Sequence, residues 1–360
     1  MGDRATGLVV VGTGFGCRVH VPAARHAGFD VVALVGADQQ RTERRAARAQ
    51  IDHALTSLTT ALALPGADVV VIATPPHTHA ELAEEAIAAG RHVLVEKPFT
   101  IDATEAGRLA DAAAHAGVTA LVGHEFRFAP ERVTLGHAIA SGLIGEPRLA
   151  TIVSQSEFLA HYASVMPSWW FEPGRGGWLG AAVSHRIDAI RTWLGDFATV
   201  SAALPSLTHS SPAVRAEDSV SLRFRLRNGC EGLLLDTAAA WGGSVNLTSV
   251  SGTTGTVTLS GDTVTLADRD GARPLDPAGP PLPIEGPECD VPGTELLHIE
   301  LAPAVVQAMV LLDLVTGRPP RYDHVAAATF ADGLACMQVL DAIRRSAAAG
   351  GASQDVEGAP

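Results

Sequence analysis

The residues from Arg91 to Phe99, with the sequence RHVLVEKPF, combine a short apolar run with a charged pair and a proline. His92 to Val95 are typical of a strand in a covered parallel sheet, where both faces are buried. In an open α/β sheet, ligands bind outside the carboxyl ends of the strands. Because Pro98 restricts the backbone that follows Lys97, the lysine would face that crevice and could exchange a proton with a bound substrate. The alternative is a solvated lysine at the end of an ordinary strand.

A second candidate site follows the first expected strand, Leu8 to Val11. Glycines at the first two positions of a G-x-G-x-x-G fingerprint permit a tight turn and let backbone N–H groups approach a pyrophosphate at the start of a helix. The third position is Cys17 where Gly or Ala is usual, and this side chain is small enough for helix–strand packing. Without a ligand, the same glycines would form a plain turn. The residues expected to contact a dinucleotide here are Gly12, Gly14, Phe15 and Gly16.

The end of the next expected strand, Val31 to Val35, bears on the choice between NAD and NADP. An acid about 20 residues past the glycines would bind the adenosine ribose of NAD. That position is Gly36; the nearest acid is Asp38, and Arg41 is followed by further arginines. The arginines could bind a 2′-phosphate, or they could be ordinary surface residues. NAD and NADP both stay open, with Asp38 and Arg41 as the candidate contacts.

The first third of the chain alternates expected strands with expected helices. Thr78 and Glu81 have the spacing of a capping box at the start of one helix. The other expected elements are strands at Val69–Ala73, near His53–Thr56 and at Ala120–Gly123, and a helix that opens near Asp102 and stops before Gly117. About six strands with crossover helices predict a doubly wound parallel sheet.

The remainder of the chain is rich in expected strands and then in helices. Apolar and polar residues alternate from Val220 to Arg227 before an Asn-Gly pair, which predicts a hairpin. A second hairpin across Gly261 and a strand at Leu149–Phe158 would complete a mostly antiparallel sheet of about five or six strands. We further expect a long loop at 269–293, helices at Pro303–Thr316 and Val325–Ala347, and a disordered tail at 347–360.

A helix after Gly177 carries another candidate. Val183, Ile187, Ile190 and Leu194 recur at helical spacing and predict its core face. His185 lies on the opposite face, together with Asp188 one turn later and Ala181 one turn earlier. A histidine on the polar side of an amphipathic helix is more often a surface residue than a functional one.

Length and charge limit the possible functions. A chain of 360 residues with 47% hydrophobic side chains is long enough for two cores, and its net charge of −13 argues against nucleic acid or an anionic membrane as a partner. The four cysteines are far apart in the sequence, so their spacing suggests neither a disulfide framework nor a metal site, and we expect no metal. With neither a leader pattern nor a run of roughly 20 apolar residues, the expected location is the cytoplasm.

Several motifs together resemble the glucose-fructose oxidoreductase/inositol dehydrogenase/MocA (Gfo/Idh/MocA) family. They are GTGFGCRVH, ATPPHTHAELAEEAI, AAGRHVLVEKPF, EFRFAPER, GGWLGAAVSHRID, SGTTGTV and DAIRRSAAAG. The resemblance implies an α/β N-terminal Rossmann domain at 1–124 and an α+β C-terminal domain with a mostly antiparallel open sheet at 125–346. It further implies NAD(P)-dependent transfer of a hydride to or from a sugar, polyol or related carbonyl compound, by a homodimer or homotetramer.

The resemblance also assigns roles to residues. Lys97 and His185 would be the catalytic pair, and the Lys97–Pro98 peptide bond would be cis. The family usually has an Asp four residues before this histidine, where the present chain has Ala181. Further expected cofactor contacts are Thr74, Pro75, His79, Glu96 and Lys97. The expected substrate contacts are Lys97, Glu125, Arg127, Trp170, His185 and Asp188, and His161 and Trp169 are plausible pocket residues.

Two other functions are compatible with these motifs. One is a redox-assisted glycosidase or lyase, in which transient oxidation makes a neighbouring proton acidic. The other is a non-catalytic dinucleotide-binding regulator, which the missing carboxylate at Ala181 would favour.

Overall fold

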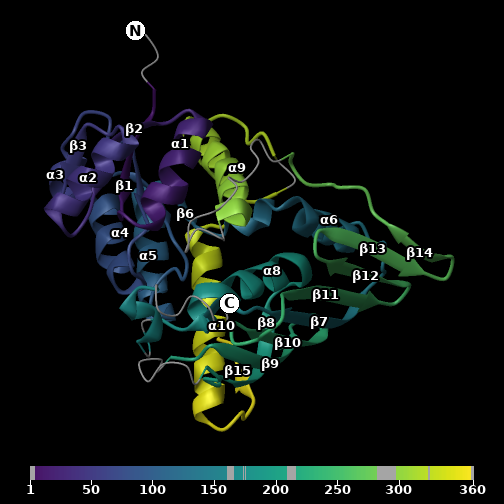
Figure 1. The fold of residues 1–360 in the computed structure, drawn as a ribbon. Helices are drawn as coiled ribbons and strands as arrows, with labels where there is room; N and C mark the ends of the chain where they lie inside the picture. The colour runs from purple at the N-terminus through teal and green to yellow at the C-terminus, as the bar shows by residue number, and fades with distance from the viewer. Residues whose placement is uncertain are drawn as a thin grey trace. The chain divides into compact units, whose positions relative to one another are not determined.

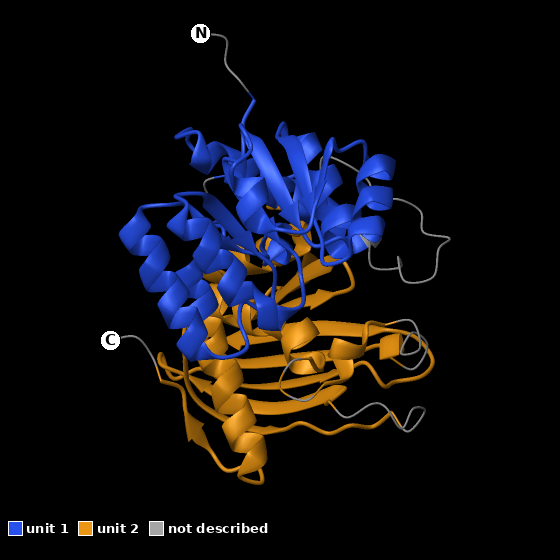
Figure 2. Ribbon diagram, turned by 90° about the vertical axis from the view of Figure 1, so that its left-hand side faces the viewer, with its two compact units in different colours: residues 1–128, 280–334 blue, residues 129–279, 335–360 orange. Residues whose placement is uncertain are grey.

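The computed structural model describes residues 5–159, 166–172, 174, 176–208, 216–281, 297–322 and 325–357. The chain divides into two compact units, residues 1–128 with 280–334 and residues 129–279 with 335–360 (Figure 2). The expected second domain, 125–346, is therefore not one continuous segment. Residues 280–334 belong to the first unit because a long helix there packs against the first helix of the chain.

The first unit contains a six-stranded parallel sheet with the strand order β3-β2-β1-β4-β5-β6. Its strands are β1 (Gly7–Val11), β2 (Asp30–Val35), β3 (His53–Leu55), β4 (Val69–Ile72), β5 (His92–Val95) and β6 (Ala120–Val122). The strands are apolar runs because helices cover both faces of such a sheet. The order reverses direction beside β1, as in a doubly wound dinucleotide-binding fold, so the predicted fold class is confirmed.

Short and long helices connect these strands (Figure 1). They are η1 (Gly16–His20), α1 (Val21–Ala27), α2 (Gln39–Ala49), α3 (Leu58–Leu62), η2 (Pro76–Thr78), α4 (His79–Ala88), α5 (Ala103–Ala116) and η3 (Glu125–Phe128). Asp102 caps α5 by accepting the Glu105 N–H at 2.9 Å, and Gly117 ends it, as predicted. The capping box at Thr78 does not form, because a 3₁₀ turn precedes α4 and the Thr78 hydroxyl donates to Thr74 and Pro75 instead.

The helix α9 (Leu297–Val315) lies beside α1 (Figure 1). Leu301, Val305 and Leu312 join the core formed by α1 and the sheet. We expected this helix to begin at Pro303, since proline favours the first helical turn, but Pro303 lies inside it. The last long helix, α10, spans Phe330–Ala348 rather than beginning at 325.

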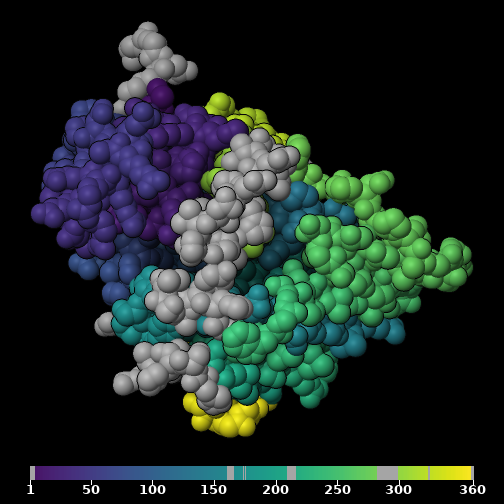
Figure 3. Space-filling model, viewed as in Figure 1, coloured from purple at the N-terminus to yellow at the C-terminus, as the bar shows by residue number. Residues whose placement is uncertain are grey.

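The second unit contains a nine-stranded sheet with the order β14-β13-β12-β11-β7-β10-β9-β8-β15. The strands are β7 (Pro147–Gln155), β8 (Phe197–Ala203), β9 (Ser219–Leu226), β10 (Glu231–Thr237), β11 (Val245–Gly252), β12 (Gly255–Ser260), β13 (Thr263–Asp268), β14 (Gly271–Pro274) and β15 (Gln354–Asp355). Both predicted hairpins are present, and β7 with β10 is the one parallel pair among the described strands of this second sheet. Figure 3 shows strands β12 to β14, in green, at the surface.

The sheet has nine strands where about five or six were expected, and β8, β14 and β15 lie where no strand was predicted. The strand β14 falls within the predicted loop 269–293 and pairs with β13. The strand β15 falls within the tail predicted to be disordered and pairs with β8, and Val356 beside it is buried. An edge strand of two residues is too short to show an alternating pattern in the sequence.

The second unit also contains the helices α6 (Pro130–Ala140), η4 (Ser168–Phe171), η5 (Leu179–Val183) and α8 (Ser184–Leu194). Of these helices, α6 contacts β12 and β13, and η5 contacts β9. On β9, the side chains of Val220, Leu222 and Phe224 are buried, while those between them are exposed. Among the described residues, no helix is long and apolar enough to cross a membrane.

Candidate functional site

Lys97 lies directly after β5, at the carboxyl edge of the parallel sheet in the first unit. The Lys97–Pro98 peptide bond is cis, which confirms the sequence-based prediction. Lys97 is partly exposed, whereas Glu96 and Pro98 on either side of it are buried. Its backbone N–H donates to Oε2 of Glu96 at 3.1 Å. The sheet therefore fixes the lysine backbone while part of the side chain stays accessible.

The carboxylate of Glu96 is held inside the protein. Its Oε1 lies 2.8 Å from Nε2 of His20, and a side chain on Gly123 would place a Cβ 2.7 Å from the same oxygen. Burial acts to raise the pKa of Glu96, but the hydrogen bond and charge of His20 and the charge of Lys97 outweigh it and leave the pKa lowered. Glu96 is thus an anion that orders the segment around Lys97, which differs from the direct cofactor contact that we expected.

His79 is also enclosed, with no exposed surface. Its Nε2 lies 2.9 Å from the carbonyl oxygen of Thr74, and its Nδ1 lies 3.1 Å and 3.2 Å from those of Pro98 and Phe99. In this structure the imidazole of His79 presents no surface to a ligand, so we interpret its role as structural, whereas the sequence led us to expect a direct cofactor contact. Thr74 and Pro75 remain partly exposed beside it.

The glycine loop fits the close approach of a ligand. Gly12 has a φ of 117°, and a Cβ on it would lie 2.2 Å from the Ala73 carbonyl oxygen, so only glycine is accommodated. A Cβ on Gly14 would meet nothing within 4 Å, which leaves open space where a pyrophosphate would approach. A Cβ on Gly16 would lie 2.8 Å from the Val10 side chain, so this glycine allows η1 to pack on β1.

Thr13 and Thr42 fill the space beside Gly36, at the end of β2. A Cβ on Gly36 would lie 2.4 Å from Thr13 Cγ2 and 2.4 Å from Thr42 Oγ1, so an acid cannot be accommodated there. Asp38 is the N-cap of α2, where its Oδ1 accepts the Arg41 N–H at 2.7 Å. The Arg41 side chain is exposed.

The sheet edge also carries acidic residues near Lys97. Burial raises the pKa of Glu125 well above its ordinary value, and Glu96 raises it further while Lys97 opposes the shift. Burial likewise raises the pKa of Glu300 to about 7 against the charge of Lys97. Glu300 lies in the first turn of α9, which packs against η1 and η3. Sequence reasoning missed Glu300 because no local motif marks it; only the packing of α9 brings it to this edge.

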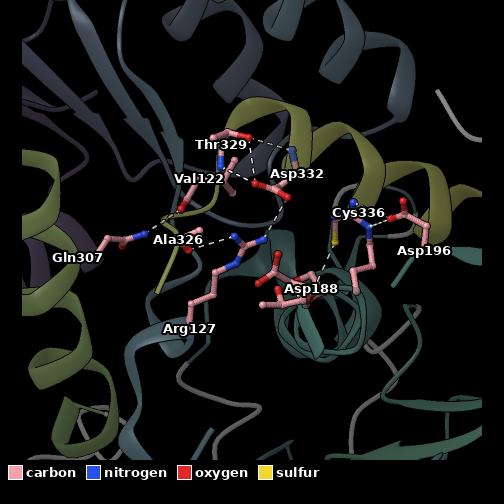
Figure 4. A network of polar contacts seen from close by, with 12 residues as sticks. Val122, Arg127, Asp188, Asp196, Gln307, Ala326, Thr329, Asp332 and Cys336 are labelled. Carbon is pink, nitrogen blue, oxygen red and sulfur yellow. Dashed lines mark hydrogen bonds and ion pairs between the residues drawn. The ribbon is translucent and has the colours of Figure 1, made fainter. Parts of the chain in front are cut away.

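The Arg127 side chain forms an ion pair and a hydrogen bond with other residues of the first unit (Figure 4). Its side chain is only 6% exposed; its Nη2 lies 3.4 Å from Asp332 Oδ1 and its Nη1 donates to the Ala326 carbonyl oxygen at 3.3 Å. Asp332 in turn accepts hydrogen bonds from the backbone and hydroxyl of Thr329. Arg127 stays a predicted substrate contact, although its guanidinium already has partners inside the first unit.

The second unit positions His185 and Asp188 on α8, directly after the π-helical turn η5. Both residues are buried, so the alternative of a surface histidine is wrong. Ala181 is also buried, at the position where the family usually has a carboxylate. A π-helical turn of this kind often occurs at functional sites because it changes the direction in which side chains point.

Trp170 belongs to an aromatic cluster in the same unit. Its ring centroid lies 5.6 Å from that of Trp169, 6.0 Å from that of Phe158 and 6.4 Å from that of Trp178. The Trp178 Nε1–H donates to Asp236 at 2.6 Å. Trp170 itself is partly exposed, whereas His161 lies outside the described residues.

The described residues of both units contain no group of three or more His, Cys, Asp or Glu side chains that could hold a metal ion. The cysteines among them, Cys17, Cys230 and Cys336, are free thiols. The candidate residues include a lysine, carboxylates and a histidine, which are groups that suit proton transfer.

Comparison with known proteins gives matches over most of the chain. Residues 6–124 match the family model described as "Oxidoreductase family, NAD-binding Rossmann fold", and residues 133–258 match the "GFO/IDH/MocA C-terminal domain". An uncharacterized oxidoreductase of Synechocystis is 30% identical over 71% of this chain and 71% of its own length. D-apiose dehydrogenase of Paraburkholderia graminis is 28% identical over 76% of this chain and 72% of its own length. A levoglucosan dehydrogenase solved with NADH and levoglucosan has the same fold, with a TM-score of 0.83 at 24% identity over 98% of this chain and 100% of its own.

Proposed function

Because this chain belongs to the Gfo/Idh/MocA oxidoreductase family and contains its NAD-binding Rossmann domain, we propose that it transfers a hydride between NAD(P) and a sugar, polyol or related carbonyl compound. The observation that carries the proposal is the position of Lys97 relative to the glycine loop. The loop follows β1 and Lys97 follows β5, and β4 alone separates these two strands in the sheet. Two strand spacings are about 10 Å, which the diphosphate and ribose of a dinucleotide can span.

The residues of the glycine loop are those that would hold the cofactor. The open space at Gly14 and the enforced turn at Gly12 fit a pyrophosphate at the start of η1. The bound nicotinamide would supply the hydride acceptor or donor.

The proton chemistry falls to residues of the chain itself. The Lys97 ammonium binds the substrate oxygen and polarises its bond to carbon, and His185 relays the proton that leaves or joins this oxygen. Glu125, Arg127, Trp170 and Asp188 complete the proposed substrate contacts. Support for a carbohydrate substrate comes from relatives such as 1,5-anhydro-D-fructose reductase of Ensifer adhaerens, which is 30% identical over 58% of this chain and 62% of its own length.

The residues after β2 bear on whether the cofactor is NAD or NADP. The crowding at Gly36 excludes the acid that would select the 2′-hydroxyl of NAD, and Arg41 is exposed one helical turn beyond. We therefore propose that NADP(H) is bound at least as well as NAD(H).

Apolar residues on the open face of the nine-stranded sheet support a homo-oligomer. Leu233 is 53% exposed, Leu149 47%, Val245 44% and Leu235 41%. The strand register places all four on one face, because Leu233 and Leu235 pair with Thr151 and Val153 of β7, and Val245 pairs with Gln155. A patch of this kind on a sheet is typical of an interface, and a second copy of the chain is its proposed partner.

Steady-state turnover tests the proposed reaction. A panel of sugars and polyols is offered with NAD or NADP in both directions, and nicotinamide absorbance is followed. We expect turnover that falls by about 10²- to 10⁴-fold in Lys97→Ala and His185→Ala, with little change in cofactor affinity. Substrate consumption without net absorbance change would instead indicate a redox-assisted glycosidase or lyase. Tight cofactor binding without turnover across the whole panel would indicate a regulator.

A further inference from the structure

His79 bridges two loops at the carboxyl edge of the first unit's sheet. One ring nitrogen lies 2.9 Å from the Thr74 carbonyl oxygen, in the loop that follows β4. The other lies 3.1 Å from the carbonyl oxygen of Pro98 and 3.2 Å from that of Phe99, directly after Lys97. The ring therefore links the segment that follows one strand to the segment that follows its neighbour.

On both sides the ring faces backbone carbonyl oxygens, which only accept hydrogen bonds. A neutral imidazole has one N–H and donates to one side at a time. Burial lowers the pKa of His79, while hydrogen bonds to Thr74, Phe99 and Pro98 and the charge of Glu96 act in the opposite direction. Without the ring, a buried carbonyl oxygen would lose its N–H donor, and a buried polar atom without a hydrogen bond destabilises the folded segment.

The opposite flank of Lys97 is also held. Glu96 accepts hydrogen bonds from His20 and from the Lys97 backbone, and its carboxylate lies against Gly123. Beyond His79, the ring of Phe99 packs on Phe330 with a centroid distance of 4.4 Å. The backbone is thus held on both sides of Lys97, and His79 is the polar contact on the Pro98 side.

We propose that His79 is a positioning residue for Lys97: its buried ring, held between the loop after β4 and the Pro98–Phe99 segment, fixes the backbone that follows Lys97 and so holds the Lys97 ammonium against the substrate oxygen. This inference rests on the proposed function. It assigns His79 no contact with substrate or cofactor and explains why the imidazole is fully enclosed at the edge of a ligand-binding sheet.

Two substitutions and a matched control test this role. His79→Phe keeps a planar ring without any donor, and His79→Gln keeps an N–H donor. His115→Gln changes an exposed histidine on α5 and serves as the control. We expect His79→Phe to lower kcat by about 10- to 100-fold, His79→Gln to lower it less, and His115→Gln to leave it unchanged. The dissociation constant for the cofactor should change by less than about twofold.

A double-mutant cycle separates positioning from general structural damage. If His79 acts through Lys97, His79→Phe should lower the residual activity of Lys97→Ala by less than about twofold. Equal fold-losses in the two backgrounds would overturn the proposal, as would full kcat in His79→Phe.

Amide hydrogen exchange gives a readout that needs no turnover. We expect His79→Phe to speed exchange in residues 97–101 more than in β1 or α5, with cofactor bound in both proteins. Unchanged exchange there would overturn the positioning role even in an active enzyme. If the wild-type chain shows no turnover on any substrate while exchange responds as expected, the proposed reaction is wrong. The role of His79 in holding the backbone after Lys97 is then still supported.

Discussion

Nε2 of His20 lies 2.8 Å from Oε1 of Glu96, and both side chains are buried directly behind Lys97. This contact, together with the charges of His20 and Lys97, lowers the pKa of Glu96 although burial acts to raise it. A carboxyl group with a lowered pKa in the folded state stabilises the fold above its unfolded pKa, and this stabilisation is lost as the pH falls through the folded pKa.

Replacement of His20 by Phe should therefore destabilise the protein in a pH-dependent way. Without the hydrogen bond, Glu96 becomes a buried charge with one partner fewer, and we expect a loss of about 2–3 kcal/mol in the free energy of unfolding at pH 7. The loss should shrink as the pH falls below about 4.5 through the lowered pKa of Glu96, where the carboxylate takes up a proton. Urea unfolding from pH 7 down through this range is the measurement, with His26→Phe, at an exposed position of α1, as the control. A loss of the same size at every pH would contradict this explanation.

The Glu300 carboxyl group should make the free energy of unfolding change with pH in the opposite direction. Burial raises its pKa from 4.5 to about 7, so the folded state binds more protons than the unfolded state between these values. The free energy of unfolding should then fall as the pH rises through this window, by at most about 3 kcal/mol from this group. Glu300→Gln should remove that part, so the variant should gain stability relative to wild type from pH 4.5 to pH 8. Thermal unfolding measures the difference, with exposed Glu81→Gln as a control that should show none.

The sequence predicted those features of the site that follow from local pattern. The strand, the glycine loop and the helix start occupy consecutive residues, so they were found without tertiary information, whereas the cis bond after Lys97 was predicted from the family resemblance. The alternation along β9 and the Asn-Gly pair likewise predicted its hairpin with β10.

Residues whose roles depend on distant partners could not be assigned in this way. Arg127 seemed available for a substrate, but it pairs with Asp332, which is far away in the sequence. His79 seemed to be a cofactor contact, yet its partners include the carbonyls of Pro98 and Phe99 in the next loop. Glu300 carries no motif and reaches Lys97 only through the packing of α9. Local periodicity contains no information about such contacts.

The crowding at Gly36 leads to a prediction about cofactor choice. Wild type should bind NADP(H) at least as tightly as NAD(H), and a preference for NAD(H) above about tenfold, or roughly 1.4 kcal/mol, would contradict this. Gly36→Asp alone should destabilise the protein, because its Cβ would meet Thr13 Cγ2 and Thr42 Oγ1 at 2.4 Å. Adding Thr13→Ser and Thr42→Ala removes both atoms, and the triple variant should shift binding toward NAD(H) by about tenfold. Calorimetry with each cofactor measures the change.

The apolar patch on the open face of the nine-stranded sheet predicts which substitution would dissociate the proposed oligomer. Leu233→Glu places a charge in the middle of the apolar patch and should convert the oligomer to a monomer, because an unpaired charge is costly in a buried interface. Leu207→Glu is the matched control, since Leu207 is 52% exposed but lies outside the strands of the patch. Light scattering after size-exclusion chromatography measures the mass. If wild type is already a monomer at micromolar concentration, the apolar patch is not an interface between copies of the chain.

The small side chain at Ala181 should affect which substrates the enzyme turns over. It is buried one helical turn before His185, where the family usually has a carboxylate, and a side chain this small leaves room for a bulkier substrate or for a water in the proton path. If the gap reflects altered specificity, Ala181→Asp should raise turnover of simple polyols by about tenfold or more, because a positioned carboxylate would again orient His185. The new carboxylate would be buried, so its pKa should be raised and the variant should unfold at a lower temperature when no ligand is bound. Ala182→Asp is the control, since Ala182 is the next residue of the same π-helical turn but is only partly buried, and it should give no gain. A folded Ala181→Asp protein whose polyol turnover equals that of wild type would show that the missing carboxylate does not set the specificity.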